Sequence, residues 1–523
     1  MKTIIRRMAP RVAVVALVLG VLAIPTAGVA LADTAYSPST DSGSMFNVAR
    51  TTGANQLWDQ HYSGQGVGVA LIDTGVSPVP GLTGGNVVNG PDLSLDAGAA
   101  NLRYLDEFGH GTHLAGIIAG RDSGPLSYGS YGDSTKFTGM APDATLVNVK
   151  VGASDGAVDV SQVIAALDWT VAHKNDPGLN IRVINLAYGT DSVQDYRIDP
   201  LAHAVEAAWQ AGIVVVTSAG NAGSTSALLT DPATDPFVLA VGADGNYDKN
   251  GHSQFITSFS SAGSPGRSPD LVAPGQSIVS LRDPQSFVDA AFPGGRVNDA
   301  AGRFFRGSGT SQATAIVSGL VADLLSKYPT MTPDQVKGLL RSKATPLAGV
   351  PATVQGAGDV NVRNLGGLKL SNVPPSTQSF ATSDGSGSLE ASRGSAHLFA
   401  ADGTPFTGEM TVFGVPFDGH SWSNNAWDGN SWSGGSWSGH SWSGNSWSGD
   451  AWTGHSWSGD VWSDDIWAGN SWSGNSWSGN SWSGNSWSGN SWSGNSWSGN
   501  SWSGNSWSGN SWSGSSWSGS SWS

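Results

Sequence analysis

Residues 307–315 read GSGTSQATA, a turn rich in glycine and serine that leads directly into the apolar stretch IVSGLVADLL at 316–325. The apolar residues recur at helical spacing, which predicts a helix that begins at the turn. The first backbone N–H groups of a helix have no partner within it, and together with the helix dipole they favour a negative charge nearby. Ser311 is therefore a candidate nucleophile, although a serine at this position is more often a simple helix cap.

A second stretch predicts a buried strand that ends in a carboxylate. Residues 66–72 read GVGVALI, which is apolar throughout, as is typical of a strand covered on both faces of a parallel sheet. Asp73 follows directly. Because ligands gather at the carboxyl ends of the strands in open parallel sheets, we expect Asp73 to lie where chemistry takes place.

The part of the chain from residue 110 to residue 221 alternates helix and strand patterns. A helix of small residues opens at His110, and later patterns predict strands at 145–151, 181–187 and 213–218 and helices at 160–173 and 200–210. This alternation predicts an α/β fold with a doubly wound parallel sheet and right-handed crossovers. Asn221 follows the last of these strands in a glycine loop, at the end of the sheet where Asp73 lies.

These four residues combine into one chemical hypothesis. A serine hydroxyl is a poor nucleophile unless a base takes its proton, and a histidine with a pKa near 6.5 can accept that proton and later return it. A buried carboxylate fixes the histidine tautomer and stabilises the imidazolium. We therefore predict a catalytic triad of Asp73, His110 and Ser311, with Asn221 and the Ser311 backbone N–H holding the oxyanion of a tetrahedral intermediate.

Three stretches resemble the signatures of the subtilisin-like serine proteases (subtilases, peptidase family S8). They read LIDTGV at 71–76, GHGTHLAG at 109–116 and GTSQA at 309–313, in the family's order, and the likeness covers about residues 50–368. The resemblance implies a serine endopeptidase with a seven-stranded parallel sheet that cleaves proteins or peptides. It also implies substrate-binding roles, which we assign to Ala187, Tyr188, Gly189, Ser218, Ala219 and Gly220.

The chain departs from the family pattern at several points. Gln312 and Ala315 stand where the family usually has Met and Pro, and Ala187-Tyr188-Gly189 replaces the usual Ser-Leu-Gly, which puts the cleavage specificity in doubt. The stretch between Asp33 and Asp73 is too short for a conventional folding-assisting propeptide. The chemistry needs no cofactor; the resemblance implies structural calcium, but no Asp-rich loop fixes a site, so the metal ligands are unknown.

The two ends of the chain have compositions of their own. Basic residues followed by the apolar run 12–24 and the sequence Ala30-Leu31-Ala32 predict a secretory signal peptide at 1–32, too short in its apolar part to span a membrane. Its removal takes four basic residues from a formal charge of −15, leaving −19. Such a surface repels phosphates and excludes nucleic acid as a partner. The chain has no cysteine, which excludes disulfides and thiol chemistry.

We divide the mature chain into an extended lead-in at 33–55, a peptidase domain at 56–368, a linker with a small β element at 369–415, and a repeat region at 416–523. From Trp422 to Trp522 a tryptophan recurs every five residues, so the repeats hold 21 of the chain's 24. Glycine at the same period suits the corners of a β-solenoid, and a disordered tail is the alternative. We expect the indoles to bind cell-wall glycans, which makes the protein extracellular and surface-associated.

Other functions fit less of the sequence. The Asp73-Thr74-Gly75 turn also suits an aspartic protease, but no second such turn follows an apolar strand. His110 and His113 could bind a metal, but they do not form the His-Glu-x-x-His motif of zinc proteases. The alternative from a different class is a catalytically inactive surface-binding protein that acts through its tryptophan repeats.

Overall fold

The computed structural model describes residues 35–99, 101–122, 131–223, 229–245, 255–365, 367–373, 375–376, 378–399 and 405–419. The expected signal peptide at 1–32 lies outside these residues, as does the repeat region beyond Gly419. No helix of the described part is long and apolar enough to cross a lipid bilayer.

One central sheet organises the described part of the chain. Seven strands run parallel in the order β2-β3-β1-β4-β5-β6-β8, and β7 joins β6 in antiparallel fashion. The strands are β1 (Gly68–Asp73), β2 (Val87–Asp92), β3 (Thr145–Lys150), β4 (Ile181–Leu186), β5 (Val214–Ser218), β6 (Leu239–Gly245), β7 (Phe255–Ile256) and β8 (Leu271–Pro274). The expectation of a seven-stranded parallel sheet is confirmed.

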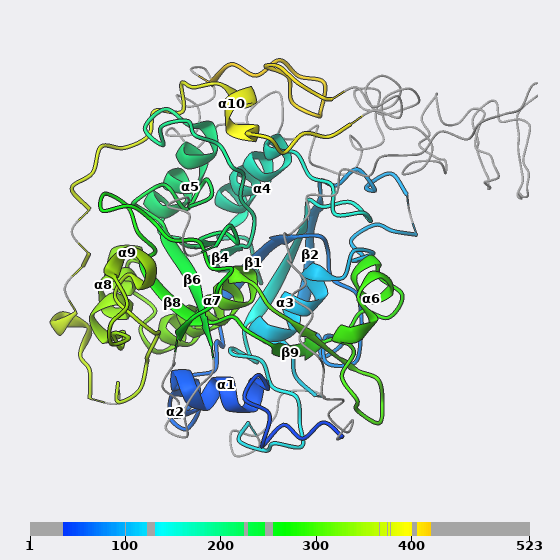
Figure 1. The fold of residues 1–523 in the computed structure, drawn as a ribbon, viewed down its shortest axis with the longest axis vertical. Helices are drawn as coiled ribbons and strands as arrows, with labels where there is room; N and C mark the ends of the chain where they lie inside the picture. The colour runs from blue at the N-terminus through cyan, green and yellow to red at the C-terminus, as the bar shows by residue number, and fades with distance from the viewer. Residues whose placement is uncertain are drawn as a thin grey trace, which may run out of the picture.

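Helices cover both faces of the sheet (Figure 1). The helices α3 (His110–Ala119) and α7 (Thr310–Lys327) pack on each other and on β1, whereas α4 (Val160–His173) and α5 (Pro200–Gln210) form a second packed pair that contacts β1 and β5. A hairpin of β9 (Ile278–Leu281) and β10 (Phe304–Gly307) lies beside α3. The shorter elements are α6 (Phe287–Ala291), η2 (Pro293–Gly295), α8 (Pro333–Lys343), α9 (Ala352–Gln355), η3 (Leu370–Asn372) and α10 (Leu389–Arg393).

The apolar strand and helix patterns account for this arrangement. Every residue of β1 is buried, and Ala70 pairs with Val147 of β3 on one side and Ile184 of β4 on the other. In α7 every residue from Thr310 to Leu325 is buried. Burial of such side chains contributes roughly 1.5–3 kcal/mol each. The core therefore fixes both the end of β1 and the beginning of α7, where two of the candidate residues lie.

The lead-in at 33–55 is not extended throughout. It contains α1 (Met45–Thr52), capped by the Ser44 side chain, and the first residues of α2 (Ala54–Trp58). Met45, Val48 and Ala49 are buried, and their spacing of three and four residues is that of one helix face. Trp58 Nε1 donates to Met140 O at 3.0 Å and to Asp323 Oδ2 at 3.1 Å, which ties this segment to α7.

The segment expected to be a linker also packs onto the domain. Residues 383–399 and 405–419, which we call the C-terminal strap, bury Leu389, Val412 and Phe413 against α4 and α5. The small β element expected in this segment is reduced to single bridges among the described residues, Phe399 with Pro405 and Met410 with Pro416.

Candidate active site

The carboxylate and the imidazole of the predicted triad are hydrogen-bonded. Asp73 is the last residue of β1 and His110 the first residue of α3, and Asp73 Oδ1 lies 2.8 Å from His110 Nδ1. The Asp73 side chain is 4% exposed and that of His110 is 27% exposed. The carboxylate is thus held inside the protein, while the imidazole can meet a substrate.

Two residues that the sequence reasoning missed hold this pair in place. Asp106 is fully buried and accepts hydrogen bonds from Gly109 N at 2.7 Å, Thr112 N at 2.6 Å and Thr74 Oγ1 at 2.7 Å. It therefore fastens the start of α3 to the residue after Asp73. Asp106 is not the N-cap of α3, which is Gly109, so no capping pattern in the sequence identifies it.

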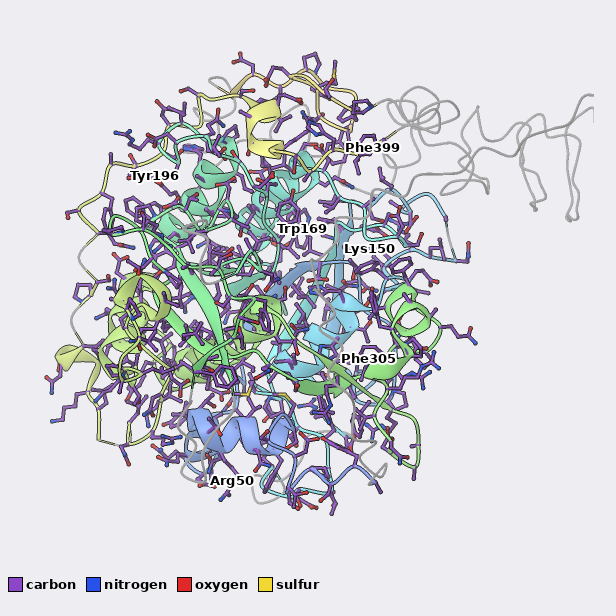
Figure 2. The ribbon with its side chains drawn as sticks, in the orientation of Figure 1. Arg50, Lys150, Trp169, Tyr196, Phe305 and Phe399 are labelled. Atoms are coloured by element: carbon purple, nitrogen blue, oxygen red, sulfur yellow. The ribbon has the colours of Figure 1, made fainter. Side chains whose placement is uncertain are left out.

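Lys150, the last residue of β3, is the second missed residue. Its side chain is fully buried (Figure 2), and Nζ donates to Leu105 O at 2.5 Å. Lys150 also lies 3.7 Å from the carboxylate of Asp96. The cation therefore fixes the loop that carries Asp106. No sequence signal assigns this role to Lys150, because the loop and the strand are far apart along the chain.

Glycine next to His110 is required by the close approach of β1 and α3. A Cβ on Gly111 would lie 2.2 Å from Gly75 O and 3.2 Å from Asp73 Oδ1. Gly109 has φ of 101°, a left-handed conformation that a side chain would strain. The glycines that flank His110 in the sequence thus allow its imidazole to reach the Asp73 carboxylate.

The environments give the two histidines of this helix opposite pKa shifts. Burial disfavours the His110 imidazolium, but the charge and hydrogen bond of Asp73 outweigh that penalty, so the pKa of His110 is raised. Burial lowers the pKa of His113 to about 4, and its Nε2 lies 3.1 Å from Phe305 O, as a donor to that carbonyl. His110 can accept a proton, whereas His113 is a neutral structural side chain.

Ser311 lies in the first turn of α7, as predicted, and Asn221 lies beside it. The Asn221 side-chain oxygen accepts from Thr310 N at 3.0 Å and Thr310 Oγ1 at 3.1 Å, which leaves its amide N–H groups turned away from Thr310. A Cβ on Gly309 would lie 3.7 Å from Ser311 N and 3.8 Å from Asn221 Nδ2. Both nitrogens therefore lie close to one point beside Gly309, and their role as oxyanion donors stays a prediction.

Ser311 is 9% exposed, and its hydroxyl makes no hydrogen bond to His110 within the described residues. Hydrogen bonds between a base and its nucleophile are often long without substrate and tighten when substrate binds. A cavity of about 60 Å³ lies beside His110, and it is lined by His110 and His113 of α3 and by Gly307 and Gln312, which lie close to Ser311 in the sequence. The structure thus pairs Asp73 with His110, and the helix that His110 opens packs on α7, which carries Ser311.

The predicted substrate-binding segments meet at Thr230. A Cβ on Gly189 would lie 2.5 Å from Thr230 Oγ1, and a Cβ on Gly220 would lie 2.7 Å from Thr230 Cγ2. Ala187, Tyr188 and Gly189 are half-buried, whereas Ser218 and Ala219 are buried at the end of β5. Burial and the nearby charges of Asp159 and Asp231 raise the pKa of Tyr188 far above its usual value. The Tyr188 hydroxyl oxygen is itself buried, so it points into the protein.

Comparison with known proteins agrees with this geometry. The model of the Subtilase family matches residues 64–366. Serine protease AprX of Bacillus subtilis (strain 168) is 36% identical over 312 residues, 58% of this chain and 67% of that protein. Subtilisin E of the same strain is 34% identical over 317 residues, which are 59% of this chain and 68% of that protein. The minor extracellular protease Epr of Bacillus subtilis (strain 168) is 29% identical over 296 residues, which are 56% of this chain and 37% of that protein.

An α/β domain with an Asp–His pair at a strand end and a serine at a helix start defines a serine endopeptidase of subtilisin-like fold. The chain belongs to the subtilase family. The family is one of serine endopeptidases, which favours an enzyme over the binding protein considered as the alternative. The family match ends at residue 366 and does not include the tryptophan repeats.

Proposed function

We propose that this protein is a secreted serine endopeptidase that works through a triad of Asp73, His110 and Ser311. The observation that carries the proposal is the 2.8 Å hydrogen bond between Asp73 Oδ1 and His110 Nδ1, which leaves Nε2 of the same ring for the Ser311 hydroxyl. A carboxylate on Nδ1 keeps the proton there and makes Nε2 the basic atom.

In the first half of the reaction, His110 Nε2 takes the proton of Ser311 Oγ as the oxygen attacks the scissile carbonyl carbon. The carbonyl oxygen becomes negative and receives hydrogen bonds from Ser311 N and Asn221 Nδ2. His110 then gives the proton to the leaving amine, the C–N bond breaks, and an acyl-Ser311 ester remains. A water molecule, with His110 as its base, then attacks the ester carbonyl carbon. This step releases the carboxylic acid product and restores the Ser311 hydroxyl.

Cleavage of casein by the purified protein tests this proposal. We expect proteolysis that a serine-directed fluorophosphonate abolishes, because the reagent forms a covalent bond with an activated serine. Folded protein without proteolytic activity would contradict the proposal.

Replacement of Asn221 tests the oxyanion hole. We expect Asn221→Ala to lower kcat by roughly 10²- to 10³-fold with little change in KM, because the donor matters most in the transition state. Asn221→Asp is the matched variant: it keeps the oxygen that accepts from Thr310 N and loses the donor. Equal losses in both variants support the role of the donor, whereas near-normal kcat in Asn221→Asp would assign Asn221 to the local fold alone.

The extracellular location rests on the signal-like segment at 1–32. The name of the relative Epr, an extracellular protease, supports it. Structural calcium remains a prediction from the family resemblance. Within the described residues no group of three or more His, Asp or Glu side chains is arranged to hold a metal ion. A rise in thermal melting temperature on adding calcium, reversed by a chelator, is the result expected if the ion binds.

We further propose that the tryptophan repeats attach the enzyme to cell-wall glycans, since indole rings stack on sugar rings. The chain has no Lys or Arg after Arg393, which argues against nucleic acid as the ligand of the repeats. A chain ending at Gly419 keeps the strap and loses the repeats. We expect the full chain to be retained on insoluble cell wall and the shortened chain to remain in solution, with equal activity on a small soluble substrate. Equal retention of both chains would remove the anchoring role and leave the peptidase function untouched.

A further inference from the structure

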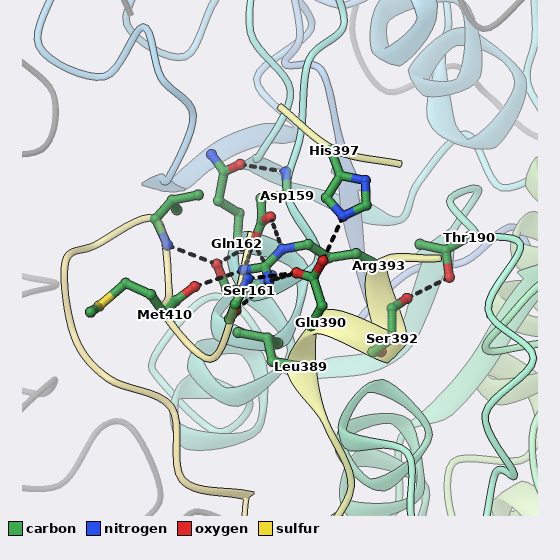
Figure 3. A network of polar contacts seen from close by, with 12 residues as sticks. Asp159, Ser161, Gln162, Thr190, Leu389, Glu390, Ser392, Arg393, His397 and Met410 are labelled. Carbon is green, nitrogen blue, oxygen red and sulfur yellow. Dashed lines mark hydrogen bonds and ion pairs between the residues drawn. The ribbon is translucent and has the colours of Figure 1, made fainter. Parts of the chain in front are cut away.

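The C-terminal strap carries a buried cation, Arg393, at the centre of a polar network (Figure 3). Arg393 is fully buried, and Nε donates to Asp159 Oδ2 at 2.6 Å. Its Nη1 donates to Glu390 Oε2 at 3.0 Å and Gly408 O at 2.7 Å, and Nη2 donates to Met410 O at 2.6 Å. One guanidinium thus gathers both halves of the strap around a carboxylate of the catalytic domain.

Asp159 links this cation to residues 151–158, which form one border of the active site. It caps α4, accepting from Ser161 N at 2.8 Å, and the strap adds a second link where Val412 N donates to Ser161 Oγ at 3.1 Å. The residues just before Asp159, 151–158, follow β3 at its carboxyl end.

This segment, 151–158, borders the catalytic residues directly. Val151 N donates to Asp73 O at 2.8 Å, and Gly156 packs so closely on Phe108 that a Cβ there would lie 2.7 Å from the ring. Phe108 is two residues before His110. Segment 151–158 thus connects Asp159 to the surroundings of both Asp73 and His110.

The strap also contacts the residues next to 187–189, which form the second border of the active site. Thr190 directly follows the predicted substrate-binding residues 187–189, and Thr190 Oγ1 donates to Ser392 O at 2.7 Å. The Asp191 carboxylate accepts from Ser395 N at 2.6 Å and from Ser395 Oγ at 2.7 Å. Between the two borders, the buried Tyr188 hydroxyl lies within the electrostatic influence of Asp159 and Arg393.

We propose that the strap, through Arg393, sets the separation of segments 151–158 and 187–189 and so positions extended peptide substrates in the cleft. Arg393 touches no reacting atom and is a positioning residue. The contacts favour this role over general stabilisation alone, because the strap binds the residues that directly follow both segments. Arg393 binds Asp159, which follows 151–158. Ser392 and Ser395 bind Thr190 and Asp191, which follow 187–189. The inference rests on the proposed peptidase function.

Substrate length separates positioning from stability. Arg393→Lys keeps the charge and loses the planar fork that spans Asp159 and the two carbonyls. We expect this variant to raise KM for a tetrapeptide anilide by roughly tenfold to 100-fold, the scale on which displaced positioning groups act. Hydrolysis of a small ester, which reaches only the region of Ser311, should be unchanged. Titration with a fluorophosphonate counts active sites, so that unfolded protein does not enter the rates.

Two further variants complete the test. Asp191→Ala removes the exposed contacts of Ser395 without opening the core, and we expect a smaller loss, again only for the tetrapeptide. Lys337→Met breaks the buried pair of Lys337 and Asp270, 3.2 Å apart and outside both borders, and should lower stability without any dependence on substrate length. Equal losses on ester and tetrapeptide in Arg393→Lys, or no loss on either, would overturn the inference. Failure of the unmodified chain to hydrolyse the ester would instead overturn the peptidase function.

Discussion

Replacement of Ser311 by alanine should reduce the rate of casein hydrolysis by about 10⁶-fold, the scale on which loss of a triad member acts. The variant lacks the oxygen that attacks the carbonyl carbon, so no acyl-enzyme can form. Binding of an extended peptide should persist, because the cleft and the oxyanion donors are unchanged. The measurement is the initial rate of casein cleavage by the two proteins at equal concentration.

Ser326→Ala is the matched control for this prediction. Ser326 lies near the end of α7, and its hydroxyl donates to Asp323 O at 2.8 Å. The same chemical change in the same helix should leave the rate within about twofold, since surface changes away from the site alter little. A Ser311→Ala protein that retained the activity of the unmodified enzyme would contradict the assignment of the nucleophile.

Asp73→Asn should lower kcat by about 10⁴-fold while leaving the protein folded. The amide is close in shape to the carboxylate, but it cannot stabilise the His110 imidazolium and can hold the ring in the wrong tautomer. Asp106→Asn is an informative companion, because Asp106 is equally buried but bonds to the backbone of the loop and not to the imidazole. We expect it to affect stability more than the chemical step.

The pH dependence gives this prediction a sign. The reaction needs neutral His110, so kcat/KM rises with pH as the imidazolium loses its proton. Asp73 raises the pKa of His110, which places the acid limb of the profile above the pH at which an unperturbed histidine titrates. In Asp73→Asn that stabilisation is lost, and the limb should move to lower pH. A limb at the same pH in both proteins would show that Asp73 does not control the ionisation of His110.

The residues with local signals were predictable from the sequence. The run of apolar residues before Asp73 identified a strand buried on both faces, and glycines beside His110 and Ser311 marked tight turns at element ends. Because carboxyl ends of parallel strands share one edge of the sheet, Asp73 and Asn221 were predicted to lie at the same end of it. The pairing of Asp73 with His110 was predicted from their chemistry, and the two side chains lie 2.8 Å apart.

What the sequence did not predict depends on contacts between distant residues. α1 is a short helix in a polar stretch, and it is held through Met45 and Val48, whose partners lie elsewhere in the chain. The strap has little regular structure, and Arg393 finds Asp159 across 234 residues. Such segments are stable only once the core exists, and no local pattern records the partner.

The same reason explains the parts of the site that were missed. Lys150 looks like the polar end of a strand, and its role as a donor to Leu105 O becomes visible only when β3 and the preceding loop are placed together. Tyr188 stands in the segment that replaces the usual Ser-Leu-Gly. Its hydroxyl is buried near charged residues that are distant in the sequence, so no local pattern reveals its surroundings.

The most direct test of the central claim is the position of the covalent adduct formed with a fluorophosphonate, mapped by mass spectrometry of the digested protein. We predict one phosphonylated residue, Ser311, formed rapidly by the unmodified chain and far more slowly by His110→Ala, because the imidazole activates the hydroxyl. A rapid adduct on another serine, or no adduct on folded protein, would contradict the triad of Asp73, His110 and Ser311.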